Sequence, residues 1–124
     1  GRIAFTGGEP FLRKDFFEIL KLANLYAKKG VKLIYGILSN GTMIGDEMAK
    51  KLKKLEVSFV QVSLDGSSAR IHDKIRGKGN FDRALKGLIA LKRAGIRRAV
   101  MFTVNKKNLK DVPNIIDLAK IRYL

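Results

Sequence analysis

The residues best suited to chemistry in this chain follow short apolar runs. The first such run ends in the segment Thr6-Gly7-Gly8-Glu9-Pro10. Two consecutive glycines let the backbone turn tightly and bring its carbonyl groups close to a ligand, because no Cβ stands in the way. The Glu9 carboxylate can accept hydrogen bonds from an ammonium group, and charged hydrogen bonds are stronger than neutral ones. Pro10 disfavours helical geometry at Glu9 and stiffens the turn.

Small polar or acidic residues follow three further apolar runs. They are Ser39, Asn40, Gly41 and Thr42, then Ser63, Asp65 and Gly66, then Thr103 and Asn105. The carboxyl ends of parallel strands lie along one edge of a sheet, where α/β proteins bind ligands. Hydroxyls, amides and two carboxylates would then converge on one pocket, which suits a zwitterionic ligand with hydroxyl groups. Turns and helix caps are the alternative explanation, and they account better for any single segment than for all four together.

The apolar runs themselves have the composition of strands. They cover residues 3–5, 33–38, 59–64 and 99–104. Because these runs are apolar and partly β-branched or aromatic, we expect strands buried on both faces of a parallel sheet. Apolar residues at helical spacing separate and follow them, at residues 16–27, 48–55, 81–91 and 112–119. Four β–α units in this order predict an α/β fold with parallel strands and right-handed crossovers.

Several element ends carry their own signals. Asp15 followed by Glu18 predicts a capping box at the first helix. Gly95 predicts a left-handed end for the third helix. The connection over residues 66–80 is longer than most βα loops, which run about 2–6 residues. We expect one helical turn at residues 68–73 and a mobile loop at residues 76–80.

Length and charge limit the class of protein. The 124 residues fit one domain, whereas a closed (β/α)8 barrel typically takes about 250 residues, so any barrel must be a partial one. The 26 Lys and Arg residues outnumber the 11 Asp and Glu residues, giving a net charge of +15. These cations are scattered over the helices, without the aromatic side chains of a base-stacking surface. The sequence therefore predicts non-specific binding of polyanions at low salt, but no specific nucleic-acid site.

Cysteine content and hydropathy exclude further classes. The chain contains no Cys, which excludes disulfides, thiolate catalysis and cysteine-ligated clusters within these 124 residues. We expect no metal ligands here, because the single histidine, His72, has no second imidazole or thiol beside it. No apolar run is long enough to span a membrane, and no signal-peptide pattern is present. The expected location is the cytoplasm.

The four strand ends together resemble radical S-adenosylmethionine (radical SAM) enzymes. Residues 7–10 resemble the family's GGEP motif, and residues 38–42 (LSNGT) are similar to its TNG segment. Residues 62–66 (VSLDG), 71–77 (IHDKIRG) and 80–81 (NF) resemble the "SLDG…HDxxRG…F" stretch of one branch, and residues 103–108 (TVNKKN) fit the end of its fifth strand. That branch includes sulfatase-maturing, peptide-modifying and cofactor-maturing members with an extra iron–sulfur domain.

The resemblance implies S-adenosylmethionine as the cofactor. The backbone of residues 7–9 and the Glu9 side chain would hold its methionyl ammonium group, while Ser39 and Ser63 match contacts to the methionine carboxylate or the ribose. The full set of expected cofactor-binding residues is Gly7, Gly8, Glu9, Ser39, Asn40, Ser63, Asp65 and Asn105. His72, Asp73 and Arg76 also match the family pattern, which by itself assigns them no role, and we expect them to contact a substrate or a carboxylate. An arginine at this position can bind a carboxylate through two parallel hydrogen bonds.

The resemblance also implies that the chain is part of something longer. The family's CxxxCxxC loop, which ligates a 4Fe–4S cluster, would precede Gly1, and a closing β–α unit would follow Leu124. We therefore expect the central part of a partial TIM-like barrel: an open curved sheet with helices on its outer face. The complete protein would cleave S-adenosylmethionine reductively to start radical modification of a peptide or cofactor precursor, whereas residues 1–124 alone would be inactive.

The open arrangement also predicts how the chain assembles. Both outer strands would present unpaired backbone groups, and exposed apolar edges invite pairing with another chain. We therefore expect a homo-oligomer formed through the sheet edges.

The alternative function is a non-catalytic α/β module that binds a small polar ligand or a polyanion. A CxxxCxxC motif shortly before Gly1 in the coding sequence would favour the enzyme.

Overall fold

A four-stranded parallel sheet forms the centre of the molecule. The computed structural model describes residues 1–120. The strands are β1 (Arg2–Phe5), β2 (Ile34–Ser39), β3 (Phe59–Ser63) and β4 (Arg97–Met101). They lie in the order β1-β2-β3-β4, and every neighbouring pair is parallel. The strand order confirms the predicted α/β fold with four β–α units.

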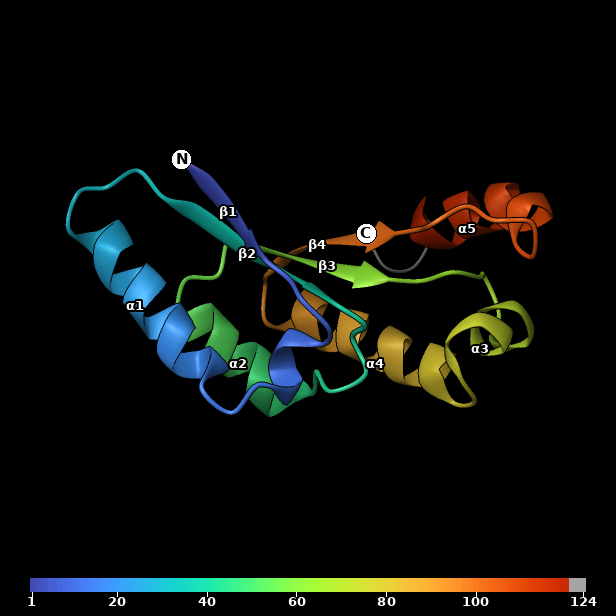
Figure 1. Cartoon of the computed structure of the whole chain (residues 1–124), viewed down its shortest axis with the longest axis horizontal. Coiled ribbons are helices and arrows are strands. Elements are labelled where there is room, and N and C mark those ends of the chain that lie inside the picture. The colour runs from blue at the N-terminus through green and yellow to red at the C-terminus, as the bar shows by residue number, and fades with distance from the viewer. Residues whose placement is uncertain (121–124) are drawn as a thin grey trace.

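The helices follow the strands in the predicted order. They are α1 (Phe16–Lys28), α2 (Asp46–Lys54), α3 (Ala69–Arg76), α4 (Asn80–Arg93) and α5 (Val112–Leu118), with short 3-10 helices η1 (Pro10–Leu12) and η2 (Leu109–Asp111). Figure 1 shows α1, α2 and α4 on one face of the sheet, below it in that view, whereas α3 and α5 lie near the carboxyl ends of β3 and β4. No helix within residues 1–120 is long and apolar enough to cross a membrane. The arrangement is a partial TIM-like barrel.

The core lies between the sheet and these helices. Alternate residues of the central strands, Tyr35, Ile37, Val60 and Val62, are buried against α1, α2 and α4. The other face of the sheet is open, and a shallow groove of about 430 Å³ runs over it, lined in part by Arg2 and Arg97. The expectation from composition that the strands are buried on both faces was therefore wrong, whereas the predicted open sheet with helices on one face is confirmed. The helices cover only one face, so β3 alternates between buried and half-buried residues and β1 is largely exposed.

Two local predictions differ from the structure. The fourth strand begins at Arg97 rather than at residue 99 and ends at Met101, because its partner β3 ends at Ser63 opposite Met101. An edge strand tolerates arginines, since part of it faces solvent. The capping box does not form, because the Asp15 carboxylate is bound by Arg13 at 2.5 and 3.1 Å instead.

The long connection after β3 is more regular than predicted. In place of a single turn, α3 spans eight residues, and the segment expected to be a mobile loop forms a tight turn into α4. Gly77 and Gly79 supply its backbone conformation, with φ of 106° and 82°, which side-chain-bearing residues rarely adopt. This turn places the carboxyl end of α3 beside the strand ends.

Candidate functional site

A polar pocket lies at the carboxyl ends of β1, β2 and β3. Its volume is about 280 Å³. It is lined by Thr6, Gly7, Gly8, Glu9, Leu38, Ser39, Asn40, Ser63, Arg76 and Met101. The fold thus brings together six of the eight residues that were expected to bind the cofactor, from three separate segments of the chain. We call this the rim pocket.

Glu9 joins two of these segments. Ser39 Oγ donates a hydrogen bond to Glu9 Oε1 at 2.7 Å, and the Asn40 amide donates to Oε2 at the same distance. The Phe11 amide donates a longer bond, of 3.4 Å, to Oε1. A carboxylate has about four acceptor positions, so Glu9 can fix the loop after β2 and still accept a bond from a ligand.

The loop after β2 is held by its own side chains and by α4. Asn40 Oδ1 accepts hydrogen bonds from the amide and the hydroxyl of Thr42, at 2.9 and 2.7 Å. Gly41 has a φ of 76°, in the left-handed region that favours glycine. Helix α4 approaches this loop so closely that a Cβ on Gly87 would lie 2.4 Å from the Gly41 carbonyl oxygen. The missing side chain at residue 87 therefore helps to position Ser39 and Asn40.

An ion pair borders the rim pocket on the side of α3. Arg76 Nε donates to Asp65 Oδ2 at 2.5 Å, and the Thr103 amide donates to Asp65 Oδ1 at 3.3 Å. Asp65 is buried, whereas the Arg76 side chain keeps 33% of its surface exposed. The remaining guanidinium nitrogens of Arg76 carry further N–H donors. The rim pocket therefore has a carboxylate, Glu9, and a guanidinium, Arg76, among its lining residues.

His72 lies behind this ion pair and outside the rim pocket. Its ring is buried and packs against Phe81, and its Nδ1 accepts a hydrogen bond from the Asp65 amide at 3.0 Å. Burial lowers the pKa of His72, and the nearby Arg76 charge lowers it further. The neutral imidazole therefore holds the backbone of Asp65, the residue that anchors Arg76.

Asp73 also works within the scaffold. Its carboxylate accepts hydrogen bonds from the Phe81 amide at 2.8 Å and from the Gly79 amide at 2.9 Å. These backbone hydrogen bonds, that of Phe81 first, lower the pKa of Asp73. Asp73 thus links α3 to the first turn of α4 and does not line the rim pocket.

The fourth strand end contributes differently from what was expected. Asn105 is exposed, and its Oδ1 accepts a bond from the Lys107 amide at 2.8 Å, away from the rim pocket. The buried residue of this loop is Asn108, whose Nδ2 donates to the carbonyls of Asp65 at 3.1 Å and Thr103 at 2.9 Å. Sequence reasoning missed that role, since Asn108 appeared only as the last residue of the segment 103–108.

Comparisons with known proteins identify the family of this chain. Residues 1–119 match the family model described as the Radical SAM superfamily. Over 117 residues the chain is 48% identical to the Fe-coproporphyrin III synthase of Methanosarcina barkeri, covering 94% of this chain and 28% of that protein. Over 114 residues it is 38% identical to the mycofactocin maturase MftC of Mycolicibacterium smegmatis, covering 91% of this chain and 28% of that protein.

Solved structures of other proteins share the fold of this chain. Native anSMEcpe with bound AdoMet superposes with a TM-score of 0.78 at 26% identity, over 96% of this chain and 34% of that one. Streptococcus suis SuiB, at 18% identity and a TM-score of 0.75 over 95% of this chain and 26% of that one, shares the fold. The chain spans about a third or less of the length of these relatives. It belongs to the radical SAM superfamily.

Proposed function

We propose that the rim pocket binds S-adenosylmethionine and that the chain is the cofactor-binding part of a radical SAM core. The observation that carries this proposal is the presence of Glu9 and Arg76 in one pocket. The methionyl end of the cofactor is a zwitterion, so its ammonium group requires an acceptor and its carboxylate a donor. Charge-assisted hydrogen bonds of both kinds are stronger than neutral ones.

Each lining segment has a part in this proposal. Backbone carbonyls near Gly7 and Gly8 join Glu9 around the ammonium group. The space beside both glycines is open, because a Cβ at either would meet no atom within 4 Å, and the ammonium group can therefore approach the backbone. Arg76, held by Asp65, binds the methionine carboxylate together with Ser63 and the side-chain NH2 group of Asn40. The Ser39 hydroxyl donates its proton to Glu9, so it accepts a hydrogen bond from the ribose. His72 and Asp73 position these groups without touching the cofactor. When bound, the cofactor supplies one-electron chemistry at its sulfonium.

The residues of this chain do not fit a 4Fe–4S cluster. Iron–sulfur clusters are held by cysteine thiolates, and the sequence has no Cys. Within residues 1–120 there is also no group of three His, Asp or Glu side chains that could hold a metal. We propose that the cluster ligands belong to other parts of a longer protein, as the 28% coverage of its relatives allows. The 124 residues alone should then be inactive, and thiolate ligands favour a reducing compartment such as the cytoplasm.

For the substrate of the complete protein, we propose a tetrapyrrole precursor first. Identity is higher to the Fe-coproporphyrin III synthase, at 48%, than to the mycofactocin maturase, at 38%. A peptide is the second candidate, because anSMEcpe was solved with both AdoMet and the peptide Kp18Cys and superposes with a TM-score of 0.79.

The test uses the complete protein, purified without oxygen and supplied with S-adenosylmethionine and a strong reductant. We expect it to form 5′-deoxyadenosine. Glu9→Gln should weaken S-adenosylmethionine binding by about tenfold or more, since bonds to charged groups contribute about 1.5–3 kcal/mol. Glu18→Gln, on an exposed part of α1, is the matched control and should change nothing. A cluster-loaded protein that forms no 5′-deoxyadenosine would refute the proposal.

A further inference from the structure

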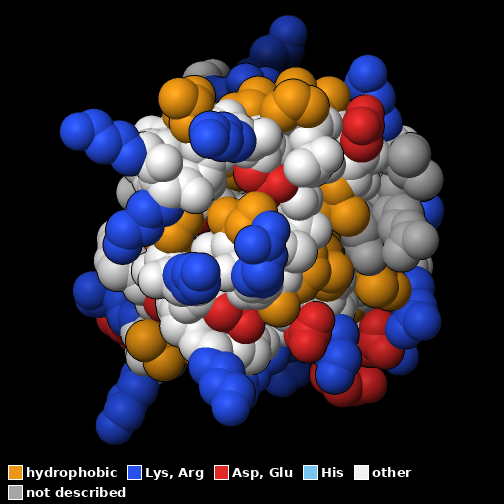
Figure 2. Space-filling model, turned by 90° about the vertical axis from the view of Figure 1, so that its right-hand side faces the viewer, with side chains coloured by type: hydrophobic (Ala, Val, Ile, Leu, Met, Phe, Trp, Pro, Cys, Tyr) orange, Lys and Arg blue, Asp and Glu red, His pale blue; other side chains and the backbone are white. Residues whose placement is uncertain are grey.

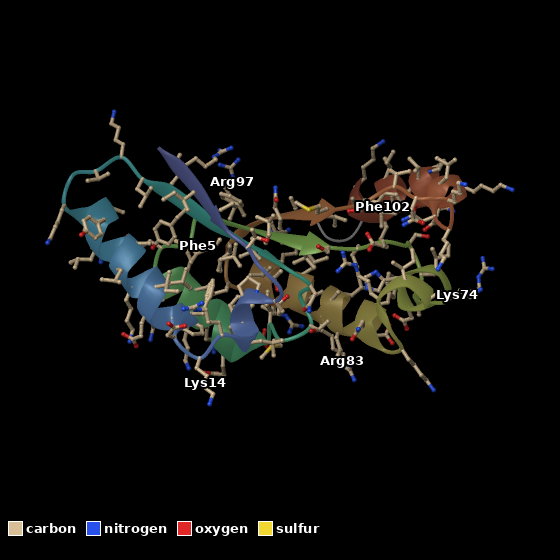
Figure 3. The ribbon with its side chains drawn as sticks, viewed as in Figure 1. Phe5, Lys14, Lys74, Arg83, Arg97 and Phe102 are labelled. Atoms are coloured by element: carbon tan, nitrogen blue, oxygen red, sulfur yellow. The ribbon has the colours of Figure 1, made fainter. Side chains whose placement is uncertain are left out.

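A second groove lies between α3 and the segment formed by η2 and α5. Its volume is about 470 Å³. It is lined by Arg70, Ile71, Lys74, Lys107, Lys110, Asp111 and Asn114, none of which lines the rim pocket. Figure 3 labels Lys74 on α3, at the end of the molecule that faces the viewer in Figure 2, where several Lys and Arg side chains gather. We call this the basic groove.

The lining of the basic groove carries four cations and one carboxylate. That carboxylate, Asp111, is buried and already accepts hydrogen bonds from the Ser67 amide at 2.6 Å, the Ser67 hydroxyl at 2.7 Å and Asn114 Nδ2 at 3.0 Å. Burial alone would raise the pKa of Asp111, but these bonds, together with the nearby Arg70 charge, outweigh it and the pKa is lowered. Asp111 is therefore charged and largely satisfied, and its charge compensates only part of the groove.

Among the described residues, the four cations lack the ion pairs that six other basic residues make. Within residues 1–120, Arg13, Lys21, Lys28, Lys50, Arg76 and Arg93 each lie within 4.0 Å of a carboxylate oxygen. In the same described part, no such pair involves Arg70, Lys74, Lys107 or Lys110. Cations gathered around one concave site repel one another, and an anion in the groove would remove that repulsion.

We propose that the basic groove binds a small ligand with two or more closely spaced phosphate or carboxylate groups. Arg70 and Lys74 are four residues apart on α3 and so project from the same side of the helix. The lysines of the loop and of η2 form the opposite wall, so an anion between them is contacted from both sides. Arg70 adds a planar fork that binds phosphate or carboxylate through paired hydrogen bonds.

The shape and composition of the basic groove favour a small ligand over a nucleic acid. Its lining contains no aromatic side chain on which bases could stack. The volume is that of a pocket for one small molecule. Because the two sites share no lining residue, this inference is independent of the function proposed for the rim pocket.

The test measures binding of inorganic pyrophosphate and of citrate to the 124-residue chain, in about 0.15 M salt so that long-range attraction is screened. We expect one saturable site, with the first amide shifts in an NMR titration at Arg70, Ile71, Lys74 and Lys110. Lys74→Gln with Lys110→Gln should weaken binding at least about tenfold. The two probes distinguish a phosphate ligand from a carboxylate ligand.

The matched control is Lys29→Gln with Lys32→Gln, which removes the same charge from exposed residues outside the groove. Binding should change by less than about twofold in the control. Equal weakening in both pairs would show general attraction to a chain of charge +15 and would overturn the proposal. So would the lack of a saturable site for both probes, or an oligonucleotide that binds the groove tighter than both. Unchanged spectra elsewhere would confirm that the variants are folded.

Discussion

Glu9 and Ser39 are 30 residues apart in the chain, and a 2.7 Å hydrogen bond joins Ser39 Oγ to Glu9 Oε1. The bond ties the turn after β1 to the turn after β2. Since Ser39 also accepts a bond from the Gly41 amide at 2.9 Å, the two turns and their polar groups form one connected unit. The acidic side of the rim pocket is therefore built before any ligand arrives, which reduces the ordering that binding must bring about.

Gly87 is predicted to be required for the shape of that unit. Replacing an exposed glycine inside a helix by alanine usually raises the stability of a protein by about 0.5–1 kcal/mol. Gly87→Ala should instead lose about 1–3 kcal/mol, because its Cβ would lie 2.4 Å from the Gly41 carbonyl oxygen. Chemical denaturation measures the difference. The unaltered chain is the reference, and a Gly87→Ala protein that is as stable or more stable would contradict the packing described here.

His72 should make stability depend on pH. Its pKa in the folded state lies below the ordinary value of 6.5, so the unfolded chain binds more protons below that pH. The free energy of unfolding should therefore be fully retained above pH 6.5 and fall as the pH drops below that value. Urea titrations at several pH values measure this slope.

Two variants isolate the contribution of His72. His72→Phe removes the titrating group and leaves the Asp65 amide without its acceptor, so it should lack the slope and lose about 1–3 kcal/mol at every pH. His72→Asn keeps an acceptor near the position of Nδ1 and should lose less at neutral pH. If the slope below pH 6.5 persisted in both variants, another group would be responsible.

Asp73 should stabilise the junction between α3 and α4. Asp73→Ala removes the acceptor of the Gly79 and Phe81 amides, and it should lower the melting temperature and speed hydrogen exchange at both amides. Asp73→Asn keeps one oxygen acceptor and should have a smaller effect. Asp82→Ala, in the same first turn of α4 but exposed, is the control. Equal exchange rates in Asp73→Ala and Asp82→Ala would show that the two bonds contribute nothing.

The edges of the sheet lead us to propose a homo-oligomer. Within the described residues β1 and β4 each have one strand neighbour, and Ile3 on β1 is 44% exposed. Edge pairing should tighten as salt screens the charge of +15. Size-exclusion chromatography with light scattering, at low and high salt, should detect a dimer or larger assembly. A monomer under both conditions at tens of micromolar chain would exclude this assembly.

The sequence was sufficient for the strand order and for most of the rim pocket. Polar residues at the ends of apolar runs must meet wherever parallel strands share one edge, so the positions of Gly7, Glu9, Ser39 and Ser63 along the chain are enough to group them. The roles of His72 and Asp73 could not be predicted, because they depend on how α3 packs over the end of β3. A local pattern does not show that a histidine accepts a bond from an amide seven residues earlier.

The basic groove was also beyond the reach of the sequence. Arg70 and Lys110 are separated by 40 positions and look like ordinary surface charges in a chain with 26 Lys and Arg residues. Only the packing of η2 and α5 against the loop after β3, through Asp111 and Ser67, brings them to one groove. The composition of the strands was misleading about their burial for a similar reason, since the burial of a strand depends on which neighbours cover it.

An NMR titration of the 124-residue chain with S-adenosylmethionine tests directly whether the rim pocket binds this cofactor. We expect weak binding, at best about millimolar or about −4 kcal/mol, with the first amide shifts at Gly7, Gly8, Asn40 and Ser63. Glu9→Gln should abolish these shifts, whereas Arg70→Gln, in the basic groove, should leave them unchanged. Two results would show that the rim pocket is not the cofactor site. One is first shifts at the amino ends of the strands, around Arg2 and Arg97, and the other is shifts that persist in Glu9→Gln.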